Sequence, residues 1–198
     1  MAEININERA EWLDRKEPEC RCQRISVSER SPGAVHDAET LIRIAIDPDH
    51  FFRKTGLLKP SILIHAETRG MSIFREERAT NDEIRTAAER LVANARAFAR
   101  QRRKSEKNIG VGGLLRMKCA DIRTFCWEHE TDPCYCVYDN ASRNNPAHAA
   151  AFQRIANVAL AVRDARRNAL FERVKAALIT VDEFRDGLLK DLAPDSEA

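Results

Sequence analysis

Apolar side chains recur at helical spacing directly after a helix-start signal near residue 80. Thr80 is followed three residues later by Glu83, the spacing of a capping box, in which each side chain caps the backbone of the other residue. Apolar positions then follow at alternating intervals of four and three residues: Ile84, Ala88, Leu91, Ala95 and Phe98. This pattern predicts a long helix from about Asn81 to Lys104, with one face in a core.

Three more stretches show helical signals. Residues 36–46 carry an apolar stripe that ends at an Asp-Pro pair, and because the residue before proline avoids the α region, a short helix is predicted there. A second long helix is predicted from Pro146 to Leu178, since a first helical turn tolerates proline and apolar residues recur beyond it. Thr180 and Glu183 repeat the capping-box spacing and predict a last, shorter helix.

Short apolar runs flank turn-forming residues at two places. Residues 61–66 and 71–74 lie on either side of a turn at Gly70, and residues 114–125 and 134–138 flank a polar turn. Each pair of runs predicts a β-hairpin. The expected fold class is therefore α+β, with two long helices plus a short C-terminal helix packed on a small antiparallel sheet of hairpins.

The composition is that of an ordinary globular protein. Of 198 residues, 43% are hydrophobic and 32% are charged, which excludes a collagen-like or a wholly disordered chain. No window reaches the roughly 18 apolar residues of a membrane span, and the first residues lack the basic and apolar parts of an export signal. We therefore expect a cytoplasmic location, with reduced cysteines and no membrane partner. The expected organisation is a polar arm over residues 1–33, a single α+β domain over 34–192 and a frayed tail over 193–198.

Charge is nearly balanced over the whole chain but is clustered locally. Lysine and arginine number 33 against 31 acidic residues, and 25 of the 33 are arginine, a bias typical of GC-rich bacterial genomes. Residues 96–107 contain six cations and one anion, which gives a local net charge of +5. The cations expected to form a contact surface on the two long helices are Arg96, Arg100, Arg103, Lys107, Arg163 and Arg167.

These arginine-rich helix faces predict a binding function. We expect a small bacterial accessory protein that binds a macromolecular partner through them, because arginine is enriched among the energetic anchors of interfaces. A protein partner is favoured over nucleic acid, since the net charge is only +2 and the two basic stripes carry no aromatic side chains for base stacking.

Four candidate metal ligands lie close together in the sequence: Cys126, His129, Cys134 and Cys136. Zinc takes four nitrogen or sulfur ligands, so a hairpin with two on each side is one way to bind it. The spacing does not repeat a C-x2-C pair, however, and Cys134 and Cys136 are interpreted as two small core side chains on one face of a strand. We therefore expect no cofactor and keep zinc as the alternative. Cys20 and Cys22 form a second C-x-C motif, and together with Cys119 they are candidates for a different metal site.

The alternative to a binding function is a small enzyme. His129, Asp139 and His148 are its candidate acid–base residues, near the second predicted hairpin and the start of the following helix. Convergence of these three side chains on one pocket would favour catalysis over binding. The sequence has neither a Gly-x-Gly-x-x-Gly motif nor a phosphate-binding loop motif, which disfavours a dinucleotide-binding enzyme and a nucleoside triphosphatase.

Overall fold

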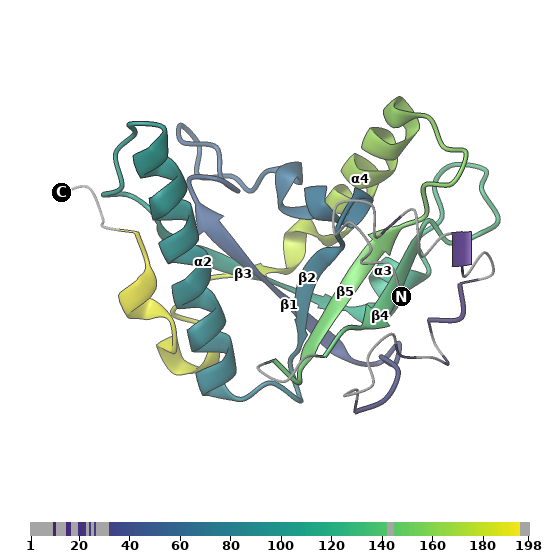
Figure 1. Ribbon diagram of the computed structural model, residues 1–198, viewed down its shortest axis with the longest axis horizontal. Coiled ribbons are helices and arrows are strands. Elements are labelled where there is room, and N and C mark those ends of the chain that lie inside the picture. The colour runs from purple at the N-terminus through teal and green to yellow at the C-terminus, as the bar shows by residue number, and fades with distance from the viewer. Residues whose placement is uncertain are drawn as a thin grey trace.

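Within the part of the chain that the structure describes, six antiparallel strands form one sheet in the order β4-β5-β2-β1-β3-β6 (Figure 1). The strands are β1 (Thr40–Asp47), β2 (Met71–Arg75), β3 (Gly110–Lys118), β4 (Tyr135–Asp139), β5 (His148–Gln153) and β6 (Leu178–Ile179). This computed structural model describes residues 32–141 and 145–194, together with Ala10, 15–16, 20–22, Arg24 and Ser26.

β1 lies at the centre of the sheet and is covered on both faces. Successive side chains of a strand point to opposite faces, so Leu41 and Ala45 enter one core while Ile42 and Ile44 enter the other. The helix predicted over residues 36–46 is therefore wrong. A strand buried on both sides is apolar at nearly every position, and such a run also contains the three-and-four spacing of a helix.

One face of the sheet is covered by α2 (Asn81–Gln101), which confirms the long helix predicted there. The capping box is formed, since the Glu83 backbone N–H donates to Thr80 Oγ1 at 3.2 Å and the Thr80 N–H donates to the Glu83 carboxylate at 2.7 Å. Ile84, Ala88 and Val92 of α2 pack in a core with side chains of β1 and β3.

The opposite face is covered by η2 (Pro60–Glu67), α3 (Cys119–Arg123) and α4 (Leu160–Val174). Leu170 and Phe171 of α4 share a core with Ile62 and Leu63 of η2 and with the strands beneath them. The two longest helices therefore lie on opposite faces of the sheet, with the strands between them (Figure 1).

The second long helix is shorter than predicted, because residues after Pro146 form strand β5 instead. β5 lies between β4 and β2, and Ala149, Ala150 and Ala151 are buried in it. Tertiary packing thus overrides the helix propensity of alanine. The packing is close: Gly70 has φ +93°, and a Cβ there would lie 2.5 Å from the Phe152 ring. Helix α4 starts only at Leu160.

The α+β class is confirmed, but neither predicted hairpin forms. Residues 61–66 lie in η2 rather than in a strand, and β3 pairs with β1 and β6 rather than with β4. The predicted last helix is replaced by two short 3₁₀ turns, η4 (Arg185–Gly187) and η5 (Lys190–Leu192). The second capping box is nevertheless present, with the Glu183 N–H donating to Thr180 Oγ1 at 3.2 Å.

The N-terminal segment covers the part of the α2 face that α2 does not reach. Paired residues of neighbouring strands share a face, so Phe152 and Tyr138 of the outer strands lie on the same side as Ile42 and Phe74. Ala10 and Cys22 pack against Phe152 and Tyr138 there. Most of the predicted arm, and the predicted tail from residue 195, lie outside the described residues. Among the helices that are described, none combines the length and apolarity needed to cross a membrane.

Candidate functional site

The three residues of the candidate acid–base site do not converge. His148 belongs to β5, not to a helix, and its Nε2 lies 2.6 Å from Ser72 Oγ on the α2 face. Asp139 lies at the end of β4 with its side chain on the opposite face, next to buried Arg75. His129 lies in an exposed loop before β4. The enzyme alternative therefore lacks the common pocket that it requires.

Asp139 belongs to a buried ion-pair network. The fully buried Arg75 guanidinium donates to both Glu39 carboxylate oxygens at 2.6 Å and to the Gly33 carbonyl at 2.7 Å. Its Nη1 lies 3.7 Å from Asp139 Oδ1, and Ser26 Oγ donates to Asp139 Oδ2 at 2.7 Å. Burial would raise the pKa of Glu39, but the hydrogen bond and charge of Arg75 outweigh it and lower that pKa. The network attaches the segment before β1 to the sheet.

The four candidate zinc ligands of the sequence are not assembled into a site. Cys134 and Cys136 enter different cores, because β4 begins only at Tyr135 and Cys134 precedes the alternation of the strand. The Cys134 thiol donates to Glu130 at 2.9 Å, and burial together with this carboxylate raises its pKa to about 12. Cys126 is exposed. The prediction that Cys134 and Cys136 share one face is wrong.

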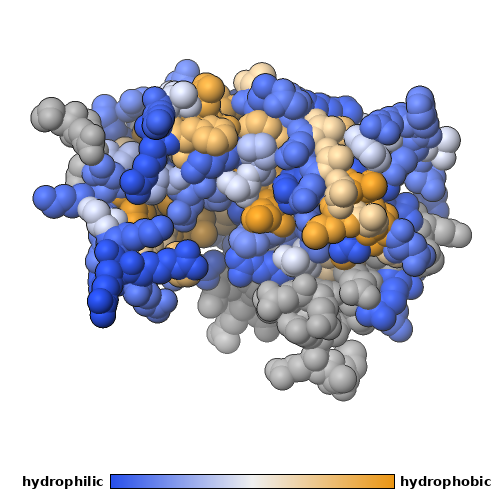
Figure 2. All heavy atoms as spheres, turned by 90° about the horizontal axis from the view of Figure 1, so that it is seen from above, coloured by the Kyte–Doolittle hydropathy of each residue, from blue (hydrophilic) through white to orange (hydrophobic). Residues whose placement is uncertain are grey.

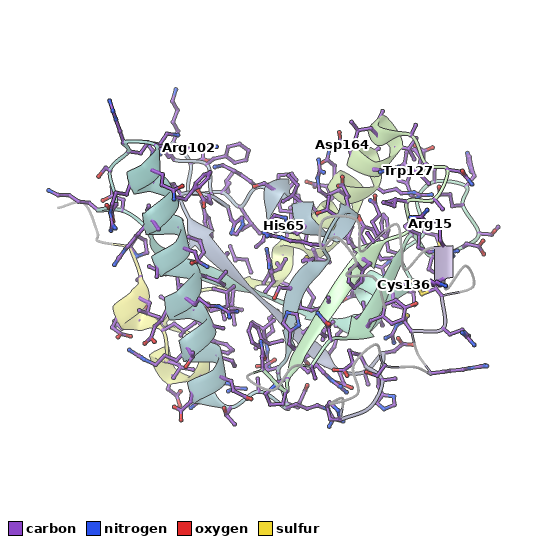
Figure 3. The ribbon with its side chains drawn as sticks, in the orientation of Figure 1. Arg15, His65, Arg102, Trp127, Cys136 and Asp164 are labelled. Atoms are coloured by element: carbon purple, nitrogen blue, oxygen red, sulfur yellow. A yellow bond between two sulfur atoms is a disulfide. The ribbon has the colours of Figure 1, made fainter. Side chains whose placement is uncertain are left out.

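A different set of cysteines does come together. Cys20 and Cys136 form a disulfide bond, and Cys22 Sγ lies 3.2 Å from Cys20 Sγ. The three sulfur atoms lie within 4.8 Å of one another. Figure 3 shows Cys136 on β4 beside the N-terminal segment. The sequence signal is the pair of C-x-C motifs, but no local pattern indicates that residues more than a hundred positions apart meet.

Most cations of the predicted contact surface are held by groups of the protein itself. The Arg96 guanidinium donates to the Ile109 carbonyl at 3.0 Å, and Arg100 makes two 2.8 Å hydrogen bonds to Glu106. Arg163 donates to the Val158 carbonyl, and Arg167 pairs with Glu67 and Asp164. Because α2 and α4 lie on opposite faces of the sheet, the two arginine-rich helices do not form one continuous face.

Two loops meet at the C-terminal end of α2. A pocket of about 470 Å³ lies between them, lined by Phe52 and Arg53 from the loop after β1 and by Ser105 and Asn108 from the loop after α2. We call this region the basic end and define it by these cations: Arg53, Lys54, Lys59, Arg102, Arg103, Lys104 and Lys107. Figure 3 shows Arg102 at this end of α2.

The basic end also carries exposed aromatic side chains. Phe98 is 50% exposed although the spacing along α2 assigns it to the apolar stripe, and Phe52 from the other loop is 48% exposed. The Arg102 guanidinium stacks 4.1 Å from the Phe98 ring centroid, and Lys59 Nζ lies 5.6 Å from that of Phe52. Figure 2 views the molecule from this side and shows apolar atoms open among hydrophilic ones. The sequence does not reveal this pair of rings, because they come from separate segments.

The buried guanidinium of Arg43 acts electrostatically on two histidines, His50 and His65. The pKa of His50 is lowered to about 3 by burial, with the charges of Arg43 and Lys59 adding to the effect. The pKa of His65 is lowered to about 4 by burial and by Arg69 and Arg43. Both histidines are therefore neutral near pH 7. His50 Nδ1 accepts the Ile46 N–H at 2.9 Å, which fixes the loop that follows β1.

No protein-family model, curated protein or solved structure matches this chain. Its function is therefore inferred from the geometry of the chain itself.

Proposed function

We propose that this chain binds single-stranded nucleic acid at the basic end. The observation that carries the proposal is a pocket lined by half-exposed Phe52 and by Arg53, beside the loop that follows α2. Half-exposed Phe98 lies in the last turn of α2, and the exposed cations Arg103, Lys104 and Lys107 follow it in the chain. Single-stranded nucleic acid is bound by this combination, in which cations follow the phosphates and aromatic rings stack on the bases.

Several cations of the basic end form no ion pair with the described residues. Among the described residues, no carboxylate lies within ion-pair distance of Arg53, Lys54, Arg103, Lys104 or Lys107. Arg103, Lys104 and Lys107 are exposed, in contrast to the internally paired arginines of α4. Such surface cations give up no internal ion pair when they contact phosphate, so they are the favourable contacts here.

The aromatic rings support the choice of nucleic acid as the partner class. The expectation of a protein partner depends on a net charge of only +2 and on basic stripes without aromatic side chains, and the exposed rings of Phe52 and Phe98 weigh against the second reason. Each ring has a cation near one face, which places a positive charge beside an aromatic surface. Polar and charged residues such as Arg53, Ser105 and Asn108 also line the pocket, unlike the apolar centre of a protein interface.

The test is fluorescence anisotropy with a labelled oligothymidylate and the full chain, over a series of salt concentrations. We expect affinity to fall steeply with salt, because bound phosphates release counterions. Arg103→Glu with Lys107→Glu should weaken binding and reduce the slope of log K against log salt by about 0.7 for each phosphate that is no longer bound. Phe98→Ala should cost about 1–3 kcal/mol of binding energy, because a base can no longer stack there.

The matched control is Arg90→Glu with Lys190→Glu, which makes the same change in charge at two exposed positions outside the basic end. Arg90 lies on α2, about 16 Å from its C-terminal end at roughly 1.5 Å of rise per residue. An equal loss of affinity in both double variants would contradict a local site. Absence of binding at low salt would refute the proposal. Binding to a protein that does not change with salt concentration would instead favour a protein partner.

A further inference from the structure

Three sulfur atoms from distant parts of the chain form a cluster that a disulfide bond alone does not explain. A disulfide uses two cysteines, here Cys20 and Cys136. Cys22 is nonetheless 1% exposed, with its sulfur 3.2 Å from that of Cys20. All three sulfurs fall within 4.8 Å, close enough to bind a single ion.

The surroundings of the cluster suit a thiolate site. Cys22 and Cys136 pack with Tyr138, Ala150 and Phe152, which form an apolar wall on the sheet side. Such a wall limits access of water and strengthens bonds to a metal ion. Cys20 is only partly buried, which leaves a path for the ion from solvent.

We propose that the reduced chain binds one Zn²⁺ through Cys20, Cys22 and Cys136, with a solvent molecule as the fourth ligand. Thiolate sulfur is a preferred donor for zinc, and three protein ligands with one open position are a common arrangement. A phosphine reductant supplies the two electrons that open the Cys20–Cys136 bond, and a water molecule supplies the two protons while its oxygen forms the phosphine oxide. The three thiols then release their protons as the sulfurs bind the ion.

The site would attach the N-terminal segment to the edge of the sheet. Cys20 and Cys22 are contributed by that segment and Cys136 by β4, the outermost strand on its side. Other contacts of the described residues of the segment include the Ala10 N–H to Thr68 carbonyl hydrogen bond at 2.7 Å and the bond from Ser26 to Asp139. Zinc would thus add three metal–sulfur bonds to the contacts that the described residues of the segment make.

The test is anaerobic titration of the full chain with Co²⁺, after reduction with a phosphine and removal of metal by a chelator. Thiolate-to-cobalt charge-transfer absorption should saturate at one equivalent and disappear when Zn²⁺ is added. Cys22→Ser is the decisive variant because Cys22 is outside the disulfide bond. It should weaken metal binding by about a hundredfold or more, since loss of a ligand exceeds the 10–100-fold effect of an outer-shell change.

Cys126→Ser is the matched control, because Cys126 is an exposed free cysteine away from the cluster. It should bind Co²⁺ like the unchanged chain. A second measurement needs no variant: in the unchanged chain, zinc should protect Cys20, Cys22 and Cys136 from alkylation while Cys126 reacts at the same rate. Failure of the reduced chain to bind either metal, or equal binding by Cys22→Ser, would refute the site and leave a plain disulfide.

Discussion

The two halves of the α2 face of the sheet are covered by different parts of the chain. Over β1 and β3, α2 buries a stripe of small and aliphatic side chains such as Ile84 and Ala88. Over β4 and β5, the N-terminal segment contributes Ala10 and the cysteine cluster. On the opposite face, the buried guanidinium of Arg75 in β2 holds the loop before β1 through Glu39 and Gly33.

The difference lies in how the stabilising energy is distributed. Apolar burial by α2 is spread over many side chains, each worth a fraction of the total, and it depends little on pH or redox state. An ion pair or a sulfur cluster concentrates stability in a few atoms, and their protonation or oxidation changes it. We therefore expect the two halves to respond to different perturbations.

The largest effect should come from a charge in the α2 core. Ile84 is fully buried, so Ile84→Asp places an unpaired carboxylate among apolar side chains and should destabilise the fold by about 4 kcal/mol or more. Urea unfolding followed by circular dichroism measures it. A variant that unfolds cooperatively at the original midpoint would show that α2 does not close this half of the face.

A smaller but still large effect is expected from Arg75→Met. Removal of one partner from a buried network leaves carboxylates uncompensated and should cost about 3–5 kcal/mol. The double variant Arg75→Met with Glu39→Leu should be more stable than the single one, because one orphaned carboxylate is gone. Urea midpoints compare the two. Equal or lower stability of the double variant would show that the charge of Glu39 is not the origin of the loss.

Acid should weaken the protein in two pH ranges that overlap below about 4.5. The folded-state pKa of His50 is about 3 against an ordinary 6.5, so the unfolded chain takes up the proton first and stability falls as pH decreases from about 6.5 toward 3. The pKa of Glu39 is lowered from 4.5, so its contribution is present above 4.5 and is lost at lower pH. Amide exchange at several pH values should show loosening of the loop after β1 first. His50→Asn should remove part of the loss above pH 4.5, and His65, whose pKa is lowered to about 4, should account for the rest.

The smallest effect on stability should come from the basic end. Arg103→Glu removes an exposed cation that pairs with no carboxylate of the described chain, so the free energy of unfolding should change by no more than about 0.5 kcal/mol. Thermal unfolding checks this. A large loss would mean that Arg103 supports the fold and that its substitution is a poor probe of binding.

Sequence patterns within one segment, such as a capping box and helical spacing of apolar residues, predict α2 well. The Thr80–Glu83 capping box and the spacing after it identify α2 nearly to the residue. The same kind of spacing wrongly predicts helix at strands β1 and β5, because each is buried on both faces and lacks the alternation of a half-exposed strand. Whether such a run becomes strand or helix depends on neighbours that are remote in the sequence.

The candidate sites are less accessible to sequence analysis for the same reason. Arg103 and Lys107 are predicted as contact residues from the sequence, but Phe52 of the proposed binding site comes from a loop some fifty positions earlier in the chain. The C-x-C motif at Cys20 is visible, whereas its meeting with Cys136 depends on the pairing of β4 within the sheet. Spacing along the chain finds sites within an element and misses those assembled between elements.

The strand order also has a consequence for how the chain reaches its fold. Thr40 pairs with Lys118 and Ile73 with Ala149, so the central strands find their partners about 75 residues along the chain. Closing such loops is slow compared with forming a helix, so α2 should acquire structure long before the sheet is complete, with folding in the millisecond-to-second range. During synthesis, the apolar residues of β1 remain without their β3 partner until residues 110–118 have been made. A chain that stops before residue 110 leaves this run without its longest partner, and such truncated chains should aggregate.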